Sequence, residues 1–261
     1  MFDLKIRKKN EVYLKVEAEP HINYELADFF TFEVESAKFM QKNKRFKGWD
    51  GKIRLFSPAT GEIYCGLLDY LLDWADKKNY RYQMEECQYF GHPLEVNEMI
   101  TPVSVAGFVK ALRLPPSLKV RDYQYKAIYE ALKYNRRLLL SPTASGKSLM
   151  IYSLVRFHVN VDRNVLIVVP TTSLVEQMYK DFEEYGWMAS EYCHKIYAGQ
   201  EKYTKHQVVI TTWQSIYKEP RKWFDRFDVV IGDEAHLFKA KSLTSLMGKL
   251  HECKYRIGFT G

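Results

Sequence analysis

The second half of the sequence alternates short apolar segments with helical patterns, and this alternation constrains the fold most strongly. From residue 118 onward, several apolar segments lack the polar alternation of a half-exposed strand: LLL, NVLIVV, QVVIT and DVVIG. Strands of this kind are typical of a parallel sheet with both faces covered. Segments with apolar residues at helical spacing separate them, so the sequence predicts an α/β domain with a central, mostly parallel sheet.

The first 90 residues follow a different pattern, which predicts a small α+β domain. Residues 2–7 and 12–17 alternate apolar and polar side chains, as the two strands of a hairpin do. Residues 22–34 are predicted as a helix, and a second hairpin is expected around the turn at 57–61, which contains Pro and Gly. A further helix and a closing strand are expected over residues 67–84.

Residues 91–117 contain four prolines and separate the two patterns. We interpret this segment as a linker with one short helix around VAGFVKAL. The expected organisation is therefore a small domain over residues 1–90, the linker over 91–117, and the α/β domain over 118–261.

The composition excludes several classes of protein. The chain is 46% hydrophobic and 27% charged, which is close to the globular average and argues against disorder. No apolar run is long enough to span a membrane, and the N-terminus lacks the apolar core of a secretory signal. The four cysteines form no C-x-x-C pair, so we expect reduced thiols in a cytoplasmic protein and no thiolate metal site.

The segment Ser141–Ser148, SPTASGKS, lies between a predicted strand and a predicted helix. It fits the phosphate-binding pattern GxxxxGK[ST], except that Ser141 replaces the first glycine. Such a loop turns backbone N–H groups toward a triphosphate, and the helix adds its positive end. Lys147 would reach the β- and γ-phosphates of ATP, and Ser148 would hold Mg²⁺. The remaining residues expected to cradle the nucleotide are Thr143, Ala144, Ser145 and Gly146.

Two adjacent carboxylates, Asp233 and Glu234, follow the apolar segment DVVIG in the motif DEAH. At the end of a buried strand, Asp233 would hold Mg²⁺ through water, and Glu234 would orient and deprotonate the attacking water. By itself, the pair could also lie in the exposed first turn of a helix, where the helix dipole stabilises acidic side chains. Its place after a phosphate-binding loop favours the catalytic interpretation, with Lys147 as the third catalytic residue.

Six ordered segments together resemble the motifs of superfamily 2 helicases and translocases: RDYQ, SPTASGKS, IVVPTTSLVEQ, VVITTWQSI, IGDEAH and GFTG. The resemblance covers residues 118–261 and implies the first RecA-like ATP-binding domain of such a motor. More narrowly, the whole chain resembles the N-terminal part of a phage DNA helicase of this superfamily, including GWDGKIRLF in the small domain.

The resemblance also implies roles for individual residues. Arg121 and Gln124 would belong to the motif that reads adenine, although Gln124 could instead be an exposed helix residue. His236 would couple the ATP site to neighbouring motifs, or be a core histidine. The residues implied in contacts with a nucleic-acid backbone are Thr171, Thr172, Gln177, Thr211, Thr212 and Gln214. Helix capping is an alternative role for the threonines, and the two roles are compatible.

Residues 38–54 carry seven cations and one anion within an otherwise acidic region. Aromatic side chains lie between these cations, a combination that suits nucleic acid. A solvated basic face is the alternative, and Trp49 and Phe56 are better explained as core residues than as stacking residues. The cations that we expect to contact DNA are Lys42, Lys44, Arg45, Lys47, Lys52 and Arg54.

The sequence and its resemblance together predict part of an ATP-dependent DNA helicase. The resemblance implies branched or forked DNA and RNA–DNA hybrids as partners, with fork regression and branch migration as activities, and no membrane partner. Such motors need a second RecA-like domain with arginine fingers, which this sequence lacks, so we expect this chain alone not to unwind DNA. The alternatives are a P-loop phosphotransferase and a structure-specific DNA-binding module in which ATP has only an ordering role.

Overall fold

A computed structural model describes residues 2–35, 37, 42, 48–85, 96–142, 144–197, 199–239 and 241–261. The side chains of Lys239 and Lys241 are not described. The chain divides into two compact units, Met1–His92 and Pro93–Gly261. Among the described residues, no helix combines the length and apolar character that crossing a membrane requires.

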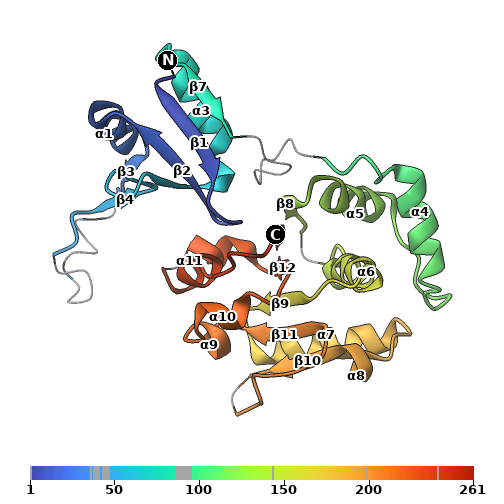
Figure 1. Cartoon of the computed structure of the whole chain (residues 1–261). Coiled ribbons are helices and arrows are strands. Elements are labelled where there is room, and N and C mark those ends of the chain that lie inside the picture. Colours follow the sequence, from blue (N-terminus) through green and yellow to red (C-terminus); the bar gives the residue numbers. More distant parts are fainter. Residues whose placement is uncertain are drawn as a thin grey trace. The chain divides into compact units, whose positions relative to one another are not determined.

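The first unit contains a five-stranded mixed sheet in the order β5-β6-β2-β1-β7 (Figure 1). As expected, β1 and β2 form an antiparallel hairpin, with Ile6 opposite Val16, and β7 adds to β1 in parallel. The described elements are β1 Leu4–Lys8, β2 Tyr13–Ala18, α1 Pro20–Phe29, β3 Thr31–Glu33, β4 Lys52–Arg54, β5 Phe56–Ser57, β6 Glu62–Tyr64, the 3₁₀ turn η2 Cys65–Leu67, α3 Leu68–Lys77 and β7 Tyr82–Met84.

The core of the first unit lies between the sheet and the helices α1 and α3. The alternating strands β1 and β2 each bury one set of side chains, such as Leu4 and Leu14. Helix α1 contributes Leu26, and α3 contributes Leu71 and Trp74. These buried apolar surfaces hold the unit together, because burying each such side chain is worth about 1.5–3 kcal/mol.

The segment 22–34, predicted as one helix, is a helix followed by a strand. Helix α1 ends at Phe29, and β3 pairs antiparallel with β4, so that Phe32 lies opposite Ile53. Thr31 and Phe32 favour extended backbone, and the partner strand satisfies their backbone hydrogen bonds. This pairing outweighs the helical spacing that the sequence presents, and a separate two-stranded ribbon results.

The second unit is built on a six-stranded sheet in the order β10-β11-β9-β12-β13-β8, and all of its pairings are parallel. This is the α/β RecA-like fold that the sequence predicts. Its described elements are α4 Pro102–Ala111, α5 Asp122–Tyr134, β8 Arg136–Leu140, α6 Lys147–Asn160, β9 Val165–Val169, α7 Thr172–Glu184, α8 Ala189–Tyr192, β10 Cys193–Ile196, β11 Val208–Thr212, α9 Trp213–Ile216, α10 Arg221–Phe224, β12 Val229–Gly232, the 3₁₀ turn η3 Ala235–Lys239, α11 Lys241–Met247 and β13 Tyr255–Thr260.

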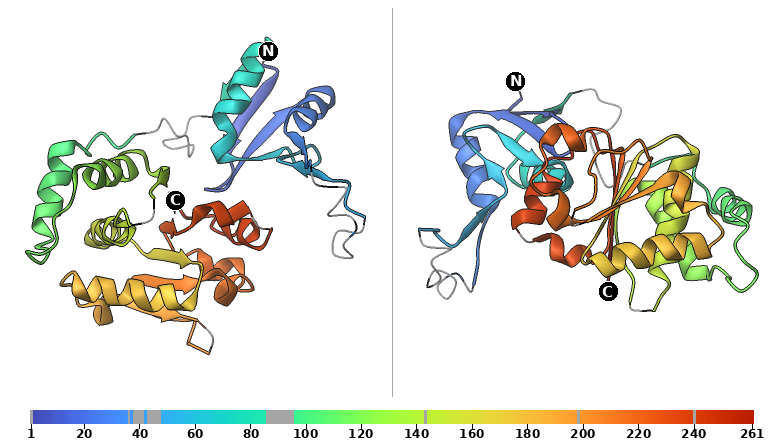
Figure 2. Two further views of the ribbon diagram at one scale, coloured as in Figure 1. Left: turned by 180° about the vertical axis from the view of Figure 1, so that it is seen from behind. Right: turned by 90° about the horizontal axis from the view of Figure 1, so that it is seen from below.

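Helices cover both faces of this sheet (Figure 2). Successive residues of β9 point to opposite faces, so Val165 and Ile167 join the core under α4–α8, while Leu166 and Val168 join the core under α9–α11. All five residues of β9 are buried, which explains why the apolar run NVLIVV shows no alternation.

The proline-containing segment predicted as a linker contributes to the second unit instead. Its helix α4 begins at Pro102 after a Thr101 cap, whose hydroxyl accepts a 3.1 Å hydrogen bond from the Ser104 N–H. Val105 and Val109 of this helix are buried in the same core as α5. Four prolines suggested a linker, but Pro at the first position of a helix is favourable, so the prolines did not exclude packing.

Candidate functional site

The motifs meet at one edge of the second sheet. Because β8, β13, β12, β9 and β11 are parallel neighbours, their carboxyl ends lie along the same edge. The SPTASGKS loop follows β8, the DEAH segment follows β12, and the PTT and TTWQ segments accompany β9 and β11. Ligands of open α/β sheets bind at this edge. The fold therefore aligns the ATP motifs beside the motifs implied in nucleic-acid contact.

Two residues of the loop between β8 and α6 have the left-handed backbone that suits the predicted phosphate contacts. Gly146 precedes α6 with φ +78° and Ala144 has φ +63°, while Thr143 lies outside the described residues. Ser141, which replaces the expected glycine, has no positive φ, and its hydroxyl lies 2.5 Å from that of Ser145. The backbone at position 141 therefore does not require glycine.

Gln124 is buried beneath this loop, with 4% of its surface exposed. Its side-chain amide donates to the Ser145 carbonyl at 2.9 Å, and its oxygen accepts from the Arg121 N–H at 2.9 Å. A side chain on Gly146 would collide with the Gln124 amide, so the glycine allows this close packing. The structure thus places Gln124 as a support of the loop. An adenine-reading role, which the resemblance implied, would require it to give up these partners.

The catalytic residues predicted from the sequence lie together. The Lys147 ammonium donates to the Glu234 carboxylate at 2.8 Å, although 87 residues separate them. Asp233 follows the last residue of β12, and burial raises the pKa of its carboxyl above the ordinary value. Glu234 itself has φ +51°, a strained conformation of the kind that clusters at functional sites.

His236 connects this pair to the end of β13. Its Nδ1 lies 2.9 Å from the Thr260 hydroxyl and 3.4 Å from a Glu234 carboxylate oxygen. The side chain is half exposed, so the alternative of a core histidine does not hold. Thr260 belongs to the GFTG segment, and this contact gives His236 a physical link between two of the motifs.

Ser148, the predicted Mg²⁺ ligand, has a protein partner in this structure. Its hydroxyl donates to the Asp181 carboxylate of α7, where burial raises the pKa of the carboxyl and this hydrogen bond partly offsets the rise. Ser148 would have to exchange this partner to hold a metal. In the described part of the chain, no group of three or more His, Cys, Asp or Glu side chains is placed to hold a metal ion.

The residues implied in backbone contacts differ in accessibility. Thr171 caps α7, accepting a 3.3 Å hydrogen bond from the Leu174 N–H, and both Thr171 and Thr172 are exposed. Gln214 is also exposed, on α9. Thr212, in contrast, is 4% exposed, and its hydroxyl lies 2.9 Å from that of Ser215. The side chain of Thr212, which was predicted to contact nucleic acid, is therefore buried. The side chains of Thr171, Thr172 and Gln214 are accessible to a ligand.

The basic segment is only partly described. Lys44, Arg45 and Lys47 lie outside the described residues, and Lys42 is exposed. Lys52 lies 3.4 Å from Glu33, and Arg54 forms an ion pair with Asp50. Phe56 is buried in the first core, and the Trp49 indole donates to the Lys52 carbonyl at 3.0 Å. The core interpretation is confirmed for Phe56, and the DNA interpretation of the cations stays a prediction.

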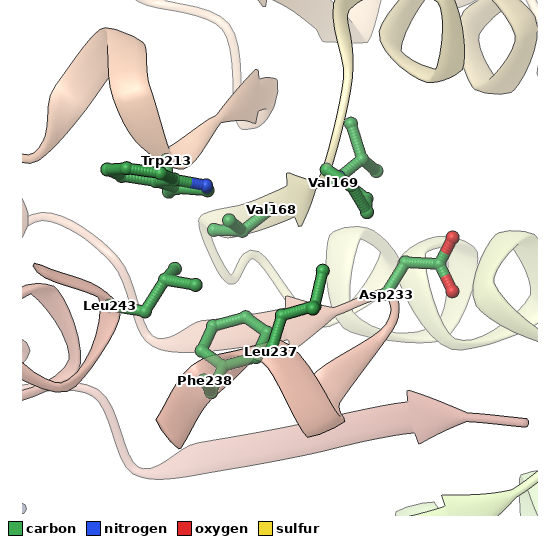
Figure 3. Close-up of a pocket in the computed structure, with 8 residues that line it drawn as sticks. Val168, Val169, Trp213, Asp233, Leu237, Phe238 and Leu243 are labelled. Carbon is green, nitrogen blue, oxygen red and sulfur yellow. The ribbon is translucent and has the colours of Figure 1, made fainter. Parts of the chain in front are cut away.

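A small apolar pocket lies between the two groups of motifs (Figure 3). Val169 and Pro170 line it from the end of β9, Trp213 from α9, and Asp233 from the end of β12. Phe238 packs across Gly232, so closely that a Cβ on the glycine would lie 2.6 Å from the ring. Phe238, which follows the DEAH segment, and Trp213 of the TTWQ segment thus line the same pocket.

Two site residues were missed in the sequence. The Tyr123 hydroxyl donates to the Ser145 carbonyl at 3.0 Å and lies beside Gln124, so the RDYQ motif contains two supports of the loop. Trp213 stands directly after the TT pair. Both lie inside quoted motifs, yet aromatic residues are common in cores, and composition alone did not distinguish them.

Two protein-family models match the chain. The family described as type III restriction enzyme, res subunit, matches residues 117–261. The family described as DNA helicase UvsW, N-terminal, matches residues 3–85. The two matches fall on the two units separately.

Individual relatives agree with these families. The chain is 32% identical, over 99% of its length, to the ATP-dependent DNA helicase uvsW of Enterobacteria phage T4 and covers 52% of that protein. It is 26% identical, over 72% of its length, to the DNA 3'-5' translocase XPB2 of Sulfurisphaera tokodaii and covers 41% of it. The chain thus spans about half the length of these relatives or less.

A solved structure supports the same similarity across both units. The crystal structure of the UvsW helicase from bacteriophage T4 has a TM-score of 0.83 and 29% identity. It covers all of this chain, and the chain covers 92% of that structure.

Proposed function

The chain belongs to the type III restriction enzyme res subunit family, and on this premise we propose that it is the ATP-binding, DNA-engaging part of a superfamily 2 helicase or translocase. One observation carries the proposal. Lys147 and Glu234 are joined at 2.8 Å beside Asp233, at the sheet edge that also presents the backbone-contact motifs. A P-loop phosphotransferase would account for the ATP motifs at this edge but not for the PTT and TTWQ segments beside them.

The residues present fit Mg²⁺ and ATP. The left-handed Ala144 and Gly146 shape the loop before a 14-residue helix, whose N-terminal N–H groups favour phosphate. Lys147 supplies the positive charge, and Asp233 supplies a carboxylate at the end of β12. When bound, Mg²⁺ would neutralise the negative charge that develops on the phosphates.

The residues of the chain would then act as follows. Lys147 exchanges Glu234 for the phosphates, because a triphosphate offers it more negative charge than one carboxylate. Glu234, once released, orients a water molecule and accepts its proton at a carboxylate oxygen. His236 contacts both Glu234 and Thr260. A movement of Glu234 on nucleotide binding would therefore be transmitted to the end of β13.

The proposed substrate is DNA with a branch or fork, and RNA–DNA hybrids are a second candidate substrate. Support comes from the cations at positions 38–54 and from the exposed Thr171, Thr172 and Gln214. The proposed activities of the whole protein are fork regression, branch migration and hybrid unwinding during replication, recombination and repair. We further propose that a second RecA-like domain completes its ATP site.

ATP hydrolysis measured with and without forked DNA, for the wild type and Lys147→Ala, tests the proposal. Turnover that depends on both DNA and Lys147 supports a motor. Measurable wild-type turnover that Lys147→Ala retains in full would refute the assigned ATP site, whereas no turnover by either chain is the result expected if a second RecA-like domain completes the site. Fork binding without nucleotide binding would favour the alternative, a DNA-binding module.

A further inference from the structure

The turn that carries the DEAH segment packs closely on two glycines of the sheet. A Cβ on Gly232, the last residue of β12, would lie 2.6 Å from two carbons of the Phe238 ring. A Cβ on Gly258 of β13 would lie 2.9 Å from that of Ala235. Neither glycine has a positive φ, so both are required for space and not for backbone conformation. The ring of Phe238 therefore rests directly on the strand end that precedes the two carboxylates.

The end of β12 is also tied to the neighbouring strand β9. The N–H of Asp233, which follows Gly232, donates to the Val168 carbonyl at 2.9 Å. The backbone of Phe238 is held as well, because its carbonyl accepts a 3.0 Å hydrogen bond from the Thr244 hydroxyl of α11. A displacement of the Phe238 ring would therefore act on the backbone of Gly232 and Asp233, since the backbone of Phe238 itself is anchored.

Trp213 lines the same pocket as Phe238 (Figure 3). It follows Thr212, which pairs with Val169 at the end of β9, so the TTWQ segment starts beside the strand that Asp233 also contacts. Protein interiors are otherwise close-packed, and this pocket is where either ring can move without displacing a strand. The pocket is thus the space through which the two groups of motifs can affect each other.

The burial of Phe238 differs from that of other phenylalanines in this core. Phe224 and Phe227 are fully buried, as expected of residues that stabilise the fold by burial alone. Phe238 is only partly buried, although it packs against the same core. What distinguishes Phe238 is its position between Gly232 and the pocket that it shares with Trp213.

We propose that Phe238 is a positioning residue that couples the DEAH carboxylates to the TTWQ segment. A change at Asp233 when nucleotide binds would move Gly232, the ring that rests on it, and with the ring the surroundings of Trp213. The inference rests on the proposed function and deepens it, because it names the side chain that links the nucleotide site to a segment proposed to contact DNA. Phe238 acts through Gly232 and Trp213 and needs no contact with either ligand.

The fluorescence of Trp213 tests this link in the full chain, with Mg²⁺ and a non-hydrolysable ATP analogue as the probe. Comparison with Trp213→Phe separates its emission from that of the four other tryptophans. We expect the saturated wild type to show a change in Trp213 emission. Phe238→Ala should lose most of this change at saturation, where a weaker affinity no longer affects the signal. Phe238→Tyr should restore the change, since the ring is retained.

Gly232→Ala provides an independent second test. Its methyl group would displace the Phe238 ring toward the pocket, so the Trp213 emission should shift even without nucleotide. In the Phe238→Ala background, Gly232→Ala should have little effect on the emission, because the ring that transmits the displacement is absent. Met247→Ala is the matched control and should retain the full change, since Met247 is also partly buried against this core and lies outside the described lining of the pocket.

Circular dichroism and thermal unfolding identify any variant that fails to fold, and Phe238→Leu then replaces Phe238→Ala. Equilibrium dialysis measures binding of the analogue separately from the fluorescence. A full change in Phe238→Ala, or a wild type that binds the analogue without a change in Trp213 emission, would overturn the inference while leaving the proposed function standing. A wild-type chain that does not bind the analogue would overturn both proposals.

Discussion

At the scale of single residues, the contact between Lys147 and Glu234 is the centre of the proposed chemistry. It joins the lysine of the phosphate loop to the proposed general base at 2.8 Å, with both side chains mostly shielded from solvent. A nucleotide must replace this ion pair before either group can act on phosphate or water. The pair therefore links nucleotide binding to the release of the base.

Glu234→Gln should separate binding from chemistry. The amide cannot accept a proton, so we expect the DNA-stimulated kcat of the complete ATP site to fall about 10²–10⁴-fold. Nucleotide affinity should be retained or rise, because Lys147 no longer leaves a carboxylate. Steady-state hydrolysis and binding of a fluorescent nucleotide measure the two quantities, and a near-normal kcat would exclude Glu234 as the base.

The pKa of Asp233 predicts a dependence of Mg²⁺ binding on pH. Burial raises this pKa, so the carboxyl takes up a proton at a higher pH than an ordinary aspartate does. The neutral form is a poor Mg²⁺ ligand, and the apparent Mg²⁺ affinity should therefore fall as the pH drops through the raised pKa. Titrations of Mg²⁺ in the presence of ATP measure this fall. Asp233→Asn should bind Mg²⁺ weakly at every pH. If its Mg²⁺ affinity followed the same pH dependence as that of the wild type, Asp233 would not be the Mg²⁺ ligand.

His158 predicts a loss of stability in acid. Burial, and then the nearby Arg163, lower its pKa to about 3, so the folded state keeps it neutral while the unfolded chain binds a proton below about pH 6.5. The contribution of neutral His158 to the free energy of unfolding is therefore fully present above that pH and decreases as the pH falls below it. Between pH 7.5 and 5 the contribution of this residue amounts to about 2 kcal/mol.

Urea unfolding of the wild type and His158→Phe at the two pH values measures this contribution. The substitution suits the aromatic neighbours Phe157 and Tyr255 and removes Nε2, which is buried without a hydrogen-bond partner. The variant should lose about 2 kcal/mol less than the wild type between pH 7.5 and 5. An identical loss in both proteins would show that another group causes the acid sensitivity.

At the scale of elements, the phosphate loop depends on the helix beneath it. Gln124 of α5 holds the Ser145 carbonyl, and Gly146 leaves room for its amide. Gly146→Ala should weaken nucleotide binding by about 1–3 kcal/mol. The alanine would have to adopt the left-handed backbone of Gly146, and its methyl group would collide with the Gln124 amide. Adding Gln124→Ala should recover part of the loss, so a double-mutant cycle of nucleotide affinities should be non-additive. Additive effects would contradict the packing.

The elements also show what the sequence can predict. The non-alternating apolar strands of the second unit were predicted in order with the helices α5, α6 and α7, because burial on both faces leaves a clear pattern in segments such as Val165–Val169. The short helices α8 to α11 were not predicted. The break after Phe29 and the ribbon at Thr31 were not predicted, since they depend on a partner strand 20 residues away. Helix α4 was interpreted as a linker because its packing against α5 is a tertiary effect.

The site was predictable to a similar degree. Lys147, Asp233 and Glu234 could be placed from motif spacing, because phosphate chemistry demands those residue types after parallel strands. The burial of Thr212 and Gln124 could not, since both are polar residues whose partners come from neighbouring segments. Local pattern therefore predicts the proposed reacting groups more readily than the residues that support them.

At the scale of the whole molecule, the buried residues that the structure describes form separate cores in the two units. Leu26 is fully buried in the first unit, so Leu26→Ala should cost that unit about 2–5 kcal/mol. Nucleotide affinity should stay unchanged, because all proposed ATP ligands lie in the second unit. Calorimetry and nucleotide titration test this, and a parallel loss of affinity would show that the units act as one.

The most direct measurement is Mg-ATP binding by this chain, in the presence and absence of forked DNA, beside Lys147→Ala and the surface control Lys205→Ala. We expect saturable binding by the wild type and by Lys205→Ala, and loss of binding in Lys147→Ala. Binding of equal strength by Lys147→Ala would contradict it, because the loop between β8 and α6 would then not be the nucleotide site.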